Sequence, residues 1–204
     1  MNGFGKFCLK CFNLFYHYKI YGKDNLPQGK AIIVCNHFRG IDPGFIADLY
    51  SDDIFFLAKK ELFKNKLFGK IITKFGAISI DRNNFDLRSL QKCIKVLNEG
   101  HKLAIFPEGT RNKTGTTELQ EIKEGTAFLS VKTKTPIVPV MLLGKAKIFR
   151  KQKIYVGKPF EFSEYYDVKP TTEDFAKMNG IIREKMLEAQ QNLFELCERP
   201  KKKK

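Results

Sequence analysis

This chain contains no apolar segment long enough to cross a bilayer as a helix. Its longest apolar runs, such as residues 137–143, fall far below the roughly 18 to 20 residues that such a helix needs. The N-terminal stretch also lacks the pattern of a secretory signal peptide, because Lys6 and Lys10 interrupt it and no small-residue cleavage site follows. We therefore expect no transmembrane helix and, if the protein acts on lipid, peripheral attachment to the cytoplasmic face of the cell membrane.

The cysteines form no evident disulfide or metal framework. Cys8 and Cys11 have a suggestive spacing, but no second Cys or His pair is placed to complete a tetrahedral metal site. We expect these two thiols to pack on the apolar face of a helix, and we expect no bound metal and no resident cofactor. The five cysteines are odd in number and scattered, which is typical of reduced thiols in a cytoplasmic protein: Cys8, Cys11, Cys35, Cys93 and Cys197.

The chain has fewer acidic residues than basic ones. The chain has 22 Asp plus Glu against 37 Lys plus Arg, which gives a formal net charge of +15. Such a charge favours an anionic partner, which is a phospholipid surface, a phosphorylated substrate, an acidic carrier protein or a nucleic acid. Charge alone does not choose among them. The sequence has no zinc finger and no ribonucleoprotein aromatic motif, and this argues against nucleic acid.

Short apolar runs alternate with helical patterns along the 204 residues. This alternation predicts a single layered α/β domain at residues 21–198, with a largely parallel central sheet flanked by helices and with functional sites in the loops at strand ends. Strands are expected at residues 31–35, 54–58, 77–81, 103–106, 137–143 and 153–156. Helices are expected at residues 44–50, 61–75, 86–98 and 172–197.

Two terminal segments lie outside this domain. Residues 1–20 contain an amphipathic helix at 4–16, whose aromatic face is suited either to a membrane interface or to packing on the core. Residues 199–204 form a basic tail, which adds attraction to an anionic bilayer or acts only as a solubilising extension.

The helix expected at 61–75 has a broad apolar stripe and a cationic opposite face. The lysines of that face are opposed by Glu61 alone. This pattern is typical of a helix attracted to anionic lipid headgroups or to an acidic carrier protein, and the alternative is an ordinary solvated face.

His37 and Asp42 are the first candidate catalytic residues. An imidazole titrates near neutral pH, and a nearby carboxylate can fix its tautomer and stabilise its charged form, so the pair suits general base catalysis. In an ideal helix a five-residue step would turn the two side chains apart by roughly 140°. We therefore expect the pair in a loop that leads into a helix, with Asp42 as a good N-cap and Pro43 at the first helical position. A role for Asp42 as a helix cap alone is the alternative.

Four sequence blocks, which follow one another along the chain in the family's order, resemble the glycerolipid acyltransferase family, and most closely the 1-acyl-sn-glycerol-3-phosphate acyltransferases. The family's His-x4-Asp motif falls on His37 and Asp42, and its Phe-Pro-Glu-Gly-Thr-Arg block falls on residues 106–111. Its Gly-x-Ile-x-Ile-Asp-Arg block matches residues 76–82, and its Val-Pro block matches residues 137–140. The family usually has Ser two residues after the His, whereas this chain has Arg39.

The resemblance implies transfer of a fatty acyl chain from acyl carrier protein or acyl-CoA to the sn-2 hydroxyl of 1-acylglycerol 3-phosphate, with phosphatidic acid as product. His37 would be the base and Asp42 its partner. No Ser or Cys lies in a nucleophile-elbow pattern, so the acceptor hydroxyl itself is expected to attack the thioester, without an acyl-enzyme. The thioester is a co-substrate in this scheme, and no cofactor is expected.

The resemblance also implies a set of residues that bind the acceptor. Arg82 and Arg111 end two of the blocks, and guanidinium groups suit the phosphate of lysophosphatidic acid. Asp81 is a possible structural partner for Arg82. Glu108 is expected to contact glycerol hydroxyls or to orient an arginine, and Lys123 to add charge or face solvent. Gly109 and Thr110 complete the predicted substrate-binding set.

Two other functions are weighed against this one. The first is acyl transfer to another acceptor, either glycerol 3-phosphate or a different lysophospholipid. The second, from another class, is nucleic-acid binding, which explains the charge of +15 but gives no role to His37 and Asp42.

Overall fold

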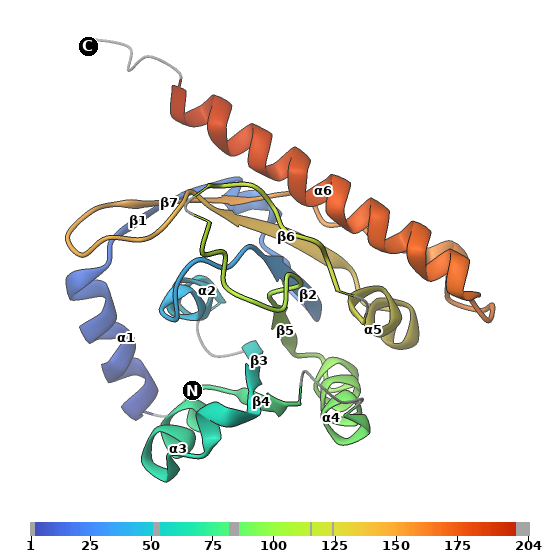
Figure 1. The fold of residues 1–204 in the computed structure, drawn as a ribbon, viewed down its shortest axis with the longest axis horizontal. Helices are drawn as coiled ribbons and strands as arrows, with labels where there is room; N and C mark the ends of the chain where they lie inside the picture. Colours follow the sequence, from blue (N-terminus) through green and yellow to red (C-terminus); the bar gives the residue numbers. More distant parts are fainter. Residues whose placement is uncertain (1–2, 51–53, 82–85, 115, 124, 199–204) are drawn as a thin grey trace.

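The computed structural model describes residues 3–50, 54–81, 86–114, 116–123 and 125–198, with the backbone alone for residues 3–7. The strands of this part form a single sheet in the order β1-β7-β6-β2-β5-β3-β4 (Figure 1). All neighbours are parallel except β6 and β7, which are antiparallel. The strands are β1 (Tyr18–Tyr21), β2 (Ala31–Cys35), β3 (Ile54–Lys59), β4 (Ala77–Ile80), β5 (Lys102–Ile105), β6 (Ile137–Leu142) and β7 (Gln152–Val156).

Helices cover both faces of the sheet (Figure 1). The apolar side chains of α4, α5 and α6 pack on one face, and those of α1 and α2 pack on the other. The α-helices are α1 (Gly3–Phe15), α2 (Asp42–Tyr50), α3 (Lys66–Lys74), α4 (Leu87–Asn98), α5 (Thr126–Thr133) and α6 (Thr172–Glu198). Short 3-10 turns are η1 (Lys23–Asn25), η2 (Lys60–Phe63) and η3 (Ser163–Tyr165).

The central strand β2 shows why the sheet needs helices on both sides. Its five residues, Ala31 to Cys35, are fully buried, and alternate side chains enter the two opposite core clusters. A strand that is apolar on both faces must be covered on both faces. This architecture confirms the predicted α/β class with a largely parallel sheet.

The helix expected at 61–75 is not continuous. The structure has the 3-10 turn η2 at Lys60–Phe63 and then α3 at Lys66–Lys74. Asn65 explains the break, because its side chain accepts a hydrogen bond of 3.0 Å from the Phe68 amide and so begins a new helix. The prediction of one helix was wrong in this respect, although the exposed apolar and cationic character of the segment remains.

The N-terminal helix α1 packs partly on the core. Leu9 is buried, and the rings of Phe12 and Phe45 of α2 meet edge to face with centroids 5.0 Å apart. Leu14 and Phe15 remain exposed at the end of the helix. Cys11 is also exposed, so the prediction that it packs was wrong. The predicted packing on the core is thus present for one face of the helix. Contact of the exposed residues with a membrane interface stays a prediction.

Two elements were missed from the sequence. Strand β1 has only four residues and lies at the edge of the sheet. Helix α5 is buried nearly all round, so its sequence shows little of the one-sided apolar pattern that marks a surface helix. Within the described ranges, none of the helices combines the length and the apolar character that crossing a membrane requires. The basic tail at 199–204 lies outside the described residues.

Candidate active site

The two main motifs meet at the same edge of the sheet. Strands β2 and β5 are parallel neighbours, with Val34 opposite Ile105. His37 follows the carboxyl end of β2, and Glu108 follows the carboxyl end of β5. The parallel sheet therefore brings together two loops that are 71 residues apart in the chain.

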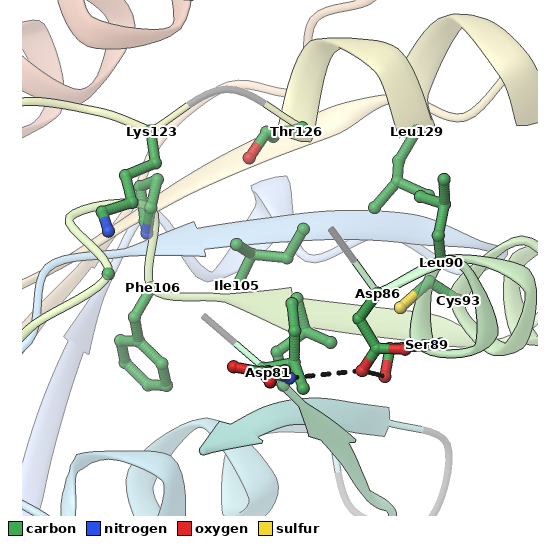
Figure 2. A pocket seen from close by; sticks show the side chains of 15 residues that line it. Asp81, Asp86, Ser89, Leu90, Cys93, Ile105, Phe106, Lys123, Thr126 and Leu129 are labelled. Carbon is green, nitrogen blue, oxygen red and sulfur yellow. Dashed lines mark hydrogen bonds between the residues drawn. The ribbon is translucent and has the colours of Figure 1, made fainter. Parts of the chain in front are cut away.

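An apolar cavity of about 270 Å³ adjoins this edge. Figure 2 shows it between β5 and the helices α4 and α5, with Leu90 and Cys93 from α4 and Leu129 from α5. Phe106 and Lys123 lie at the side nearer the motif loop (Figure 2). The cavity is thus lined largely by hydrocarbon and has charged or polar groups at its margin.

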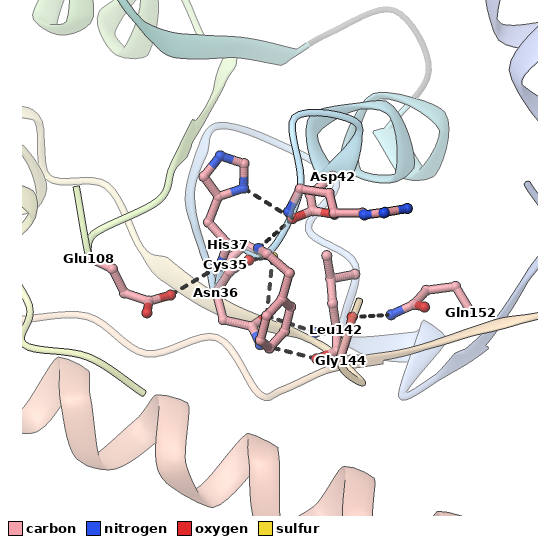
Figure 3. A network of polar contacts seen from close by, with 10 residues as sticks. Cys35, Asn36, His37, Asp42, Glu108, Leu142, Gly144 and Gln152 are labelled. Atoms are coloured by element: carbon pink, nitrogen blue, oxygen red, sulfur yellow. Dashed lines mark hydrogen bonds and ion pairs between the residues drawn. The ribbon is translucent and has the colours of Figure 1, made fainter. Parts of the chain in front are cut away.

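His37 and Asp42 form a hydrogen-bonded pair (Figure 3). The distance from His37 Nδ1 to Asp42 Oδ2 is 3.0 Å. The same carboxylate oxygen accepts the backbone amides of Phe38 and Arg39, each at 2.6 Å. Asp42 is fully buried, whereas the His37 side chain is 13% exposed. The loop conformation predicted from the five-residue spacing is therefore present, and Asp42 begins α2 while it also contacts the imidazole.

This contact fixes which nitrogen of His37 is available for proton transfer. A carboxylate can only accept a hydrogen bond, so in the neutral imidazole Nδ1 carries the proton and Nε2 has the lone pair. The Phe106 ring packs on the imidazole with ring centroids 4.3 Å apart. The imidazole is thus held by a hydrogen bond at one nitrogen and by an aromatic ring on its face.

The loop after β5 also holds the backbone of His37. Glu108 Oε1 accepts the His37 amide at 3.0 Å, and the Asn112 amide donates to the His37 carbonyl at 2.7 Å. Glu108 Oε2 accepts the Gln120 amide at 3.2 Å. Burial raises the pKa of the Glu108 carboxyl group, and the two amide hydrogen bonds oppose this change. Glu108 therefore joins the two motifs, a contact that sequence reasoning missed because a backbone amide leaves no mark in the sequence. Its predicted contact with glycerol stays a prediction.

Asn36 connects the same loop to a third strand. Its side-chain amide donates to the Leu142 carbonyl at 3.0 Å, and its side-chain oxygen accepts the Leu142 amide at 2.8 Å (Figure 3). Asn36 is 3% exposed, so water competes little for these bonds. The end of β2 is thereby fixed between β5 and β6.

Gly109 and Lys123 are in direct contact. Gly109 has a φ of +68°, and a Cβ at this position would lie 2.7 Å from Lys123 Cδ. Only glycine accommodates both the left-handed backbone and the crossing lysine stem. Thr110 donates from Oγ1 to Gln120 Oε1 at 3.2 Å on the exposed side of the loop. The structure thus gives Gly109 a conformational role.

Of the two predicted phosphate-binding arginines, the structure describes Arg111 but not Arg82. Arg82 lies outside the described residues, whereas Asp81 forms an ion pair with Lys60. Arg111 is exposed and lines a second cavity, together with Arg39 and Lys145. Strand β4, which precedes Arg82, is separated from β5 by β3. The cations that accompany Arg111 therefore come from loops that sequence reasoning had not combined with it.

Cys35 precedes His37 by two residues in the chain, and it is fully buried. Burial raises the pKa of its thiol well above the ordinary value, and the charges of Asp42 and Glu108 add to this effect. A thiol in this state stays protonated and is a poor nucleophile. Cys35 therefore functions as a core residue.

Comparisons with known proteins agree with this arrangement. An acyltransferase family model matches residues 17–143. The 1-acyl-sn-glycerol-3-phosphate acyltransferase of Bacillus subtilis is 31% identical over 185 residues, covering 87% of this chain and 90% of that protein. The enzyme of the same name from Borreliella burgdorferi is 30% identical over 176 residues, and the match covers 81% of this chain and 68% of that enzyme.

A solved structure shares the fold. The crystal structure of the 1-acyl-sn-glycerophosphate acyltransferase PlsC from Thermotoga maritima matches with a TM-score of 0.65 at 23% identity, covering 98% of this chain and 79% of that one. The family match extends over more than half of the chain and includes both motifs of the His37 site. The resemblance seen in the four sequence blocks is thereby confirmed, and this chain belongs to the acyltransferase family.

Proposed function

We propose that this protein transfers a fatty acyl chain from a thioester, carried by acyl carrier protein or coenzyme A, to the sn-2 hydroxyl of 1-acyl-sn-glycerol 3-phosphate, forming phosphatidic acid. The observation that carries the proposal is the His37–Asp42 pair, with Nδ1 bonded to the buried carboxylate and Nε2 available as a base. The names of the relatives support this choice of acceptor.

The reaction needs one proton to move twice. His37 Nε2 takes the proton of the sn-2 hydroxyl while the oxygen attacks the thioester carbonyl. The carbon–sulfur bond then breaks, and the proton passes from the imidazolium to the departing thiolate, which leaves as a thiol. Asp42 stabilises the imidazolium between these steps, and general base catalysis of this kind is typically worth about 10²–10⁴-fold in rate.

The surroundings of the pair favour direct transfer within a ternary complex. Cys35 is held protonated by burial, so it is unsuited to form an acyl-enzyme. The acceptor oxygen therefore acts as the nucleophile itself. Both substrates must be bound together in this scheme, which predicts sequential rather than ping-pong kinetics.

The apolar cavity supplies a place for an acyl chain. It is lined by Leu57, Leu90, Ile105 and Leu129, and Phe106 lies both at the cavity and against His37. A chain bound there has its reactive end near the imidazole. Burial of the chain contributes about 0.8 kcal/mol per methylene group.

Exposed apolar residues support docking on a membrane. One patch consists of Leu14 and Phe15 of α1 and of Ile148 and Phe149 from the loop between β6 and β7. The amide of Phe149 donates to the Phe15 carbonyl at 2.8 Å, and Phe149 is 70% exposed. The second patch consists of Leu62, Leu67 and Phe68 on η2 and α3, and exposed lysines surround it.

The helices α1 and α3, which carry residues of the two patches, lie on the same side of the molecule (Figure 1). Apolar side chains among lysines suit the boundary between acyl chains and anionic headgroups. Attachment to the cytoplasmic face of the cell membrane follows as part of the proposal.

The test is transfer of a labelled acyl chain to 1-acylglycerol 3-phosphate, with acyl carrier protein and coenzyme A thioesters in separate reactions. Native protein is compared with His37→Ala and with the control His17→Ala, because His17 is exposed and takes no part in the His37–Asp42 contact. Product from native protein and His17→Ala, but not from His37→Ala, is expected. The thioester that supports the reaction identifies the donor.

Equal product from native protein and His37→Ala would contradict the role of the base. Absence of product with either thioester, in the presence of anionic liposomes, would contradict the acceptor. The same assay with glycerol 3-phosphate then tests the next acceptor.

A further inference from the structure

A third cavity, of about 510 Å³, lies between the end of α1, helix α2 and the loop that joins β6 to β7. Its lining includes the carboxylate of Asp48 and the exposed lysine Lys151. It also includes three aromatic side chains, those of Tyr16, Tyr18 and Phe149. A negative and a positive charge thus stand at one cavity, together with aromatic rings.

This cavity lies at the same edge of the sheet as His37. Strand β6 runs parallel to β2, and β7 runs antiparallel to β6, so β7 begins at the edge where β2 ends. Strand β1 is parallel to β7, with Tyr18 opposite Gln152. The residues just before these two strands therefore meet at that edge, and Lys151 is one of them. An occupant of the cavity would lie on the reacting side of the sheet.

Asp48 is held by neutral partners. Its Oδ1 accepts the side-chain amide of Asn13 at 3.0 Å, and its Oδ2 accepts the hydroxyl of Tyr18. Burial and, next, the hydrogen bond to Asp48 raise the pKa of Tyr18, so the phenol stays a donor. No lysine, arginine or histidine of the described part of the chain forms an ion pair with Asp48. A carboxylate has about four lone-pair sites, so two remain for a ligand.

Phe149 lines the cavity in a strained backbone conformation. Its φ is +60°, a left-handed value that bulky residues rarely adopt. Its ring lies 5.8 Å from the ring of Phe15, and both residues belong to the first exposed apolar patch. Strain of this kind persists where the surrounding structure fixes it, and it is frequent at ligand sites. The cavity therefore adjoins the surface that the proposed function places against a membrane.

The charges select the class of ligand. Asp48 would repel a headgroup that is only anionic, and Lys151 would repel a group that is only cationic. A zwitterionic headgroup offers its ammonium to the carboxylate and its phosphate to the lysine. A primary ammonium has three N–H donors for the remaining lone pairs of Asp48, whereas a quaternary ammonium has none. The nearby tyrosine rings add attraction for the cation.

We propose that this cavity binds the headgroup of a membrane phospholipid that carries a primary ammonium, as phosphatidylethanolamine does. Asp48 binds the ammonium, Lys151 binds the phosphate, and Phe149 packs where the headgroup meets the acyl chains. The assignment to a membrane lipid rests on the membrane attachment in the proposed function. The lipid bound here is not the acyl acceptor, so the site makes attachment depend on the composition of the bilayer.

The test compares binding to two kinds of vesicle with the same fraction of phosphatidylglycerol, the remainder being phosphatidylethanolamine or phosphatidylcholine. Native protein is measured beside Asp48→Asn and Lys151→Ala. Asp24→Asn and Lys147→Ala are the charge-matched controls, because both residues are exposed and neither lines the cavity. Thermal unfolding reports folding. Acyl transfer to hexanoyl lysophosphatidic acid, a monomeric acceptor, reports the proposed reaction.

Native protein should bind the phosphatidylethanolamine vesicles about 5-fold more tightly, the size expected for one partly exposed charge pair. Asp48→Asn should bind both kinds of vesicle about equally. Asp24→Asn, which changes the net charge by the same amount, should keep the native ratio. Successive N-methylation of the phosphatidylethanolamine should weaken binding stepwise in native protein, because each methyl group replaces an N–H donor.

Glycerophosphoethanolamine, which is the headgroup without acyl chains, separates recognition of the headgroup from properties of the bilayer. Its affinity is measured by NMR titration, with glycerophosphocholine for comparison. Native protein should bind glycerophosphoethanolamine the more tightly of the two. Asp48→Asn and Lys151→Ala should both bind it more weakly than native protein does, whereas Lys147→Ala should match native protein.

An equal preference for phosphatidylethanolamine in native protein and Asp48→Asn would overturn the site, because the preference would then come from the packing of the bilayer. Transfer of an acyl chain to lysophosphatidylethanolamine that is lost in Asp48→Asn would assign the cavity to the acceptor and overturn the bilayer lipid. Should Asp48→Asn unfold, Lys151→Ala carries the test, because Lys151 is exposed.

The failure of the site and the failure of the proposed function give different results. Acyl transfer by a native protein that shows no preference between the vesicles would overturn the site and leave the reaction. The preference without acyl transfer would overturn the reaction and leave the site. Binding of glycerophosphoethanolamine without binding of any vesicle would uphold the headgroup contacts and overturn the membrane lipid as their source.

Discussion

The inner and outer parts of this site are held in different ways. Asp42 and Glu108 are buried. Asp42 accepts hydrogen bonds from His37 Nδ1 and from the amides of Phe38 and Arg39, and Glu108 accepts the amides of His37 and Gln120. By contrast, Arg39, Arg111 and Lys145 are exposed, and only Arg39 has a side-chain hydrogen bond among the described residues.

The two groups of residues are held differently because proton transfer and attraction of a phosphate depend on distance in different ways. Proton transfer depends on hydrogen-bond geometry, so a base must be fixed within a fraction of an ångström. Attraction of a phosphate depends on charge, which varies slowly with distance and tolerates mobile side chains. We therefore expect changes in the inner part to affect kcat and stability, and changes in the outer part to affect KM.

The largest effect is expected from Asp42→Asn. Asparagine keeps the size of the side chain but removes the charge that stabilises the imidazolium, so kcat should fall by about 10²-fold or more. Steady-state kinetics with lysophosphatidic acid measures this. Asp48→Asn is the control, because Asp48 is on the same helix and bonds Asn13 and Tyr18 instead. Equal kcat values in the two variants would remove Asp42 from the mechanism.

Glu108→Ala should be the most destabilising of these changes. It leaves the amides of His37 and Gln120 without their acceptor, at a cost of about 1–3 kcal/mol for each buried group. Denaturant unfolding gives the free energy, and Glu121→Ala, an exposed change in the same loop, is the control. A loss no greater than that of Glu121→Ala would show that the two motif loops hold together without Glu108.

Arg111→Ala should act on binding of the acceptor. We expect KM for lysophosphatidic acid to rise about 10-fold with little change in kcat, since a charge-assisted hydrogen bond is removed. The salt dependence of KM should weaken, because an exposed cation interacts through screened charge. Kinetics at two salt concentrations, with Lys113→Ala as control, separates this from a fall in kcat, which would place Arg111 in the inner part.

The smallest effect concerns pH and the raised pKa of Glu108. The carboxyl group keeps its proton in the folded protein at pH values where the unfolded chain, with a pKa near 4.5, has released it. The unfolded state then binds fewer protons, so this group lowers the free energy of unfolding as pH rises from about 4.5 to the folded pKa. Above the folded pKa its contribution is constant.

Glu108→Gln tests this directly. The free energy of unfolding of native protein, minus that of the variant, should decline over the same pH window and then level off. A difference that increases with pH would mean that the folded pKa is lowered instead.

Sequence patterns predicted the elements with strong signals. Residues 31–35 form a strand as expected, because a continuous apolar run of this length suits a strand buried on both faces. Helix α5 escaped prediction since it is buried on most sides, and β1 because four residues give too short a pattern. Asn65 divided the expected helix at 61–75 because its side chain competes locally as a cap.

The sequence by itself determined the chemistry of the site. The spacing of His37 and Asp42 requires a loop, and the cation that ends residues 106–111 suits phosphate. Only the tertiary structure decided which groups meet. Glu108 holds the His37 amide because β2 and β5 are neighbours, and Arg39, Arg111 and Lys145 line one cavity because three separate loops converge at the carboxyl edge of the sheet. Contacts between distant segments depend on strand order, which local patterns do not specify.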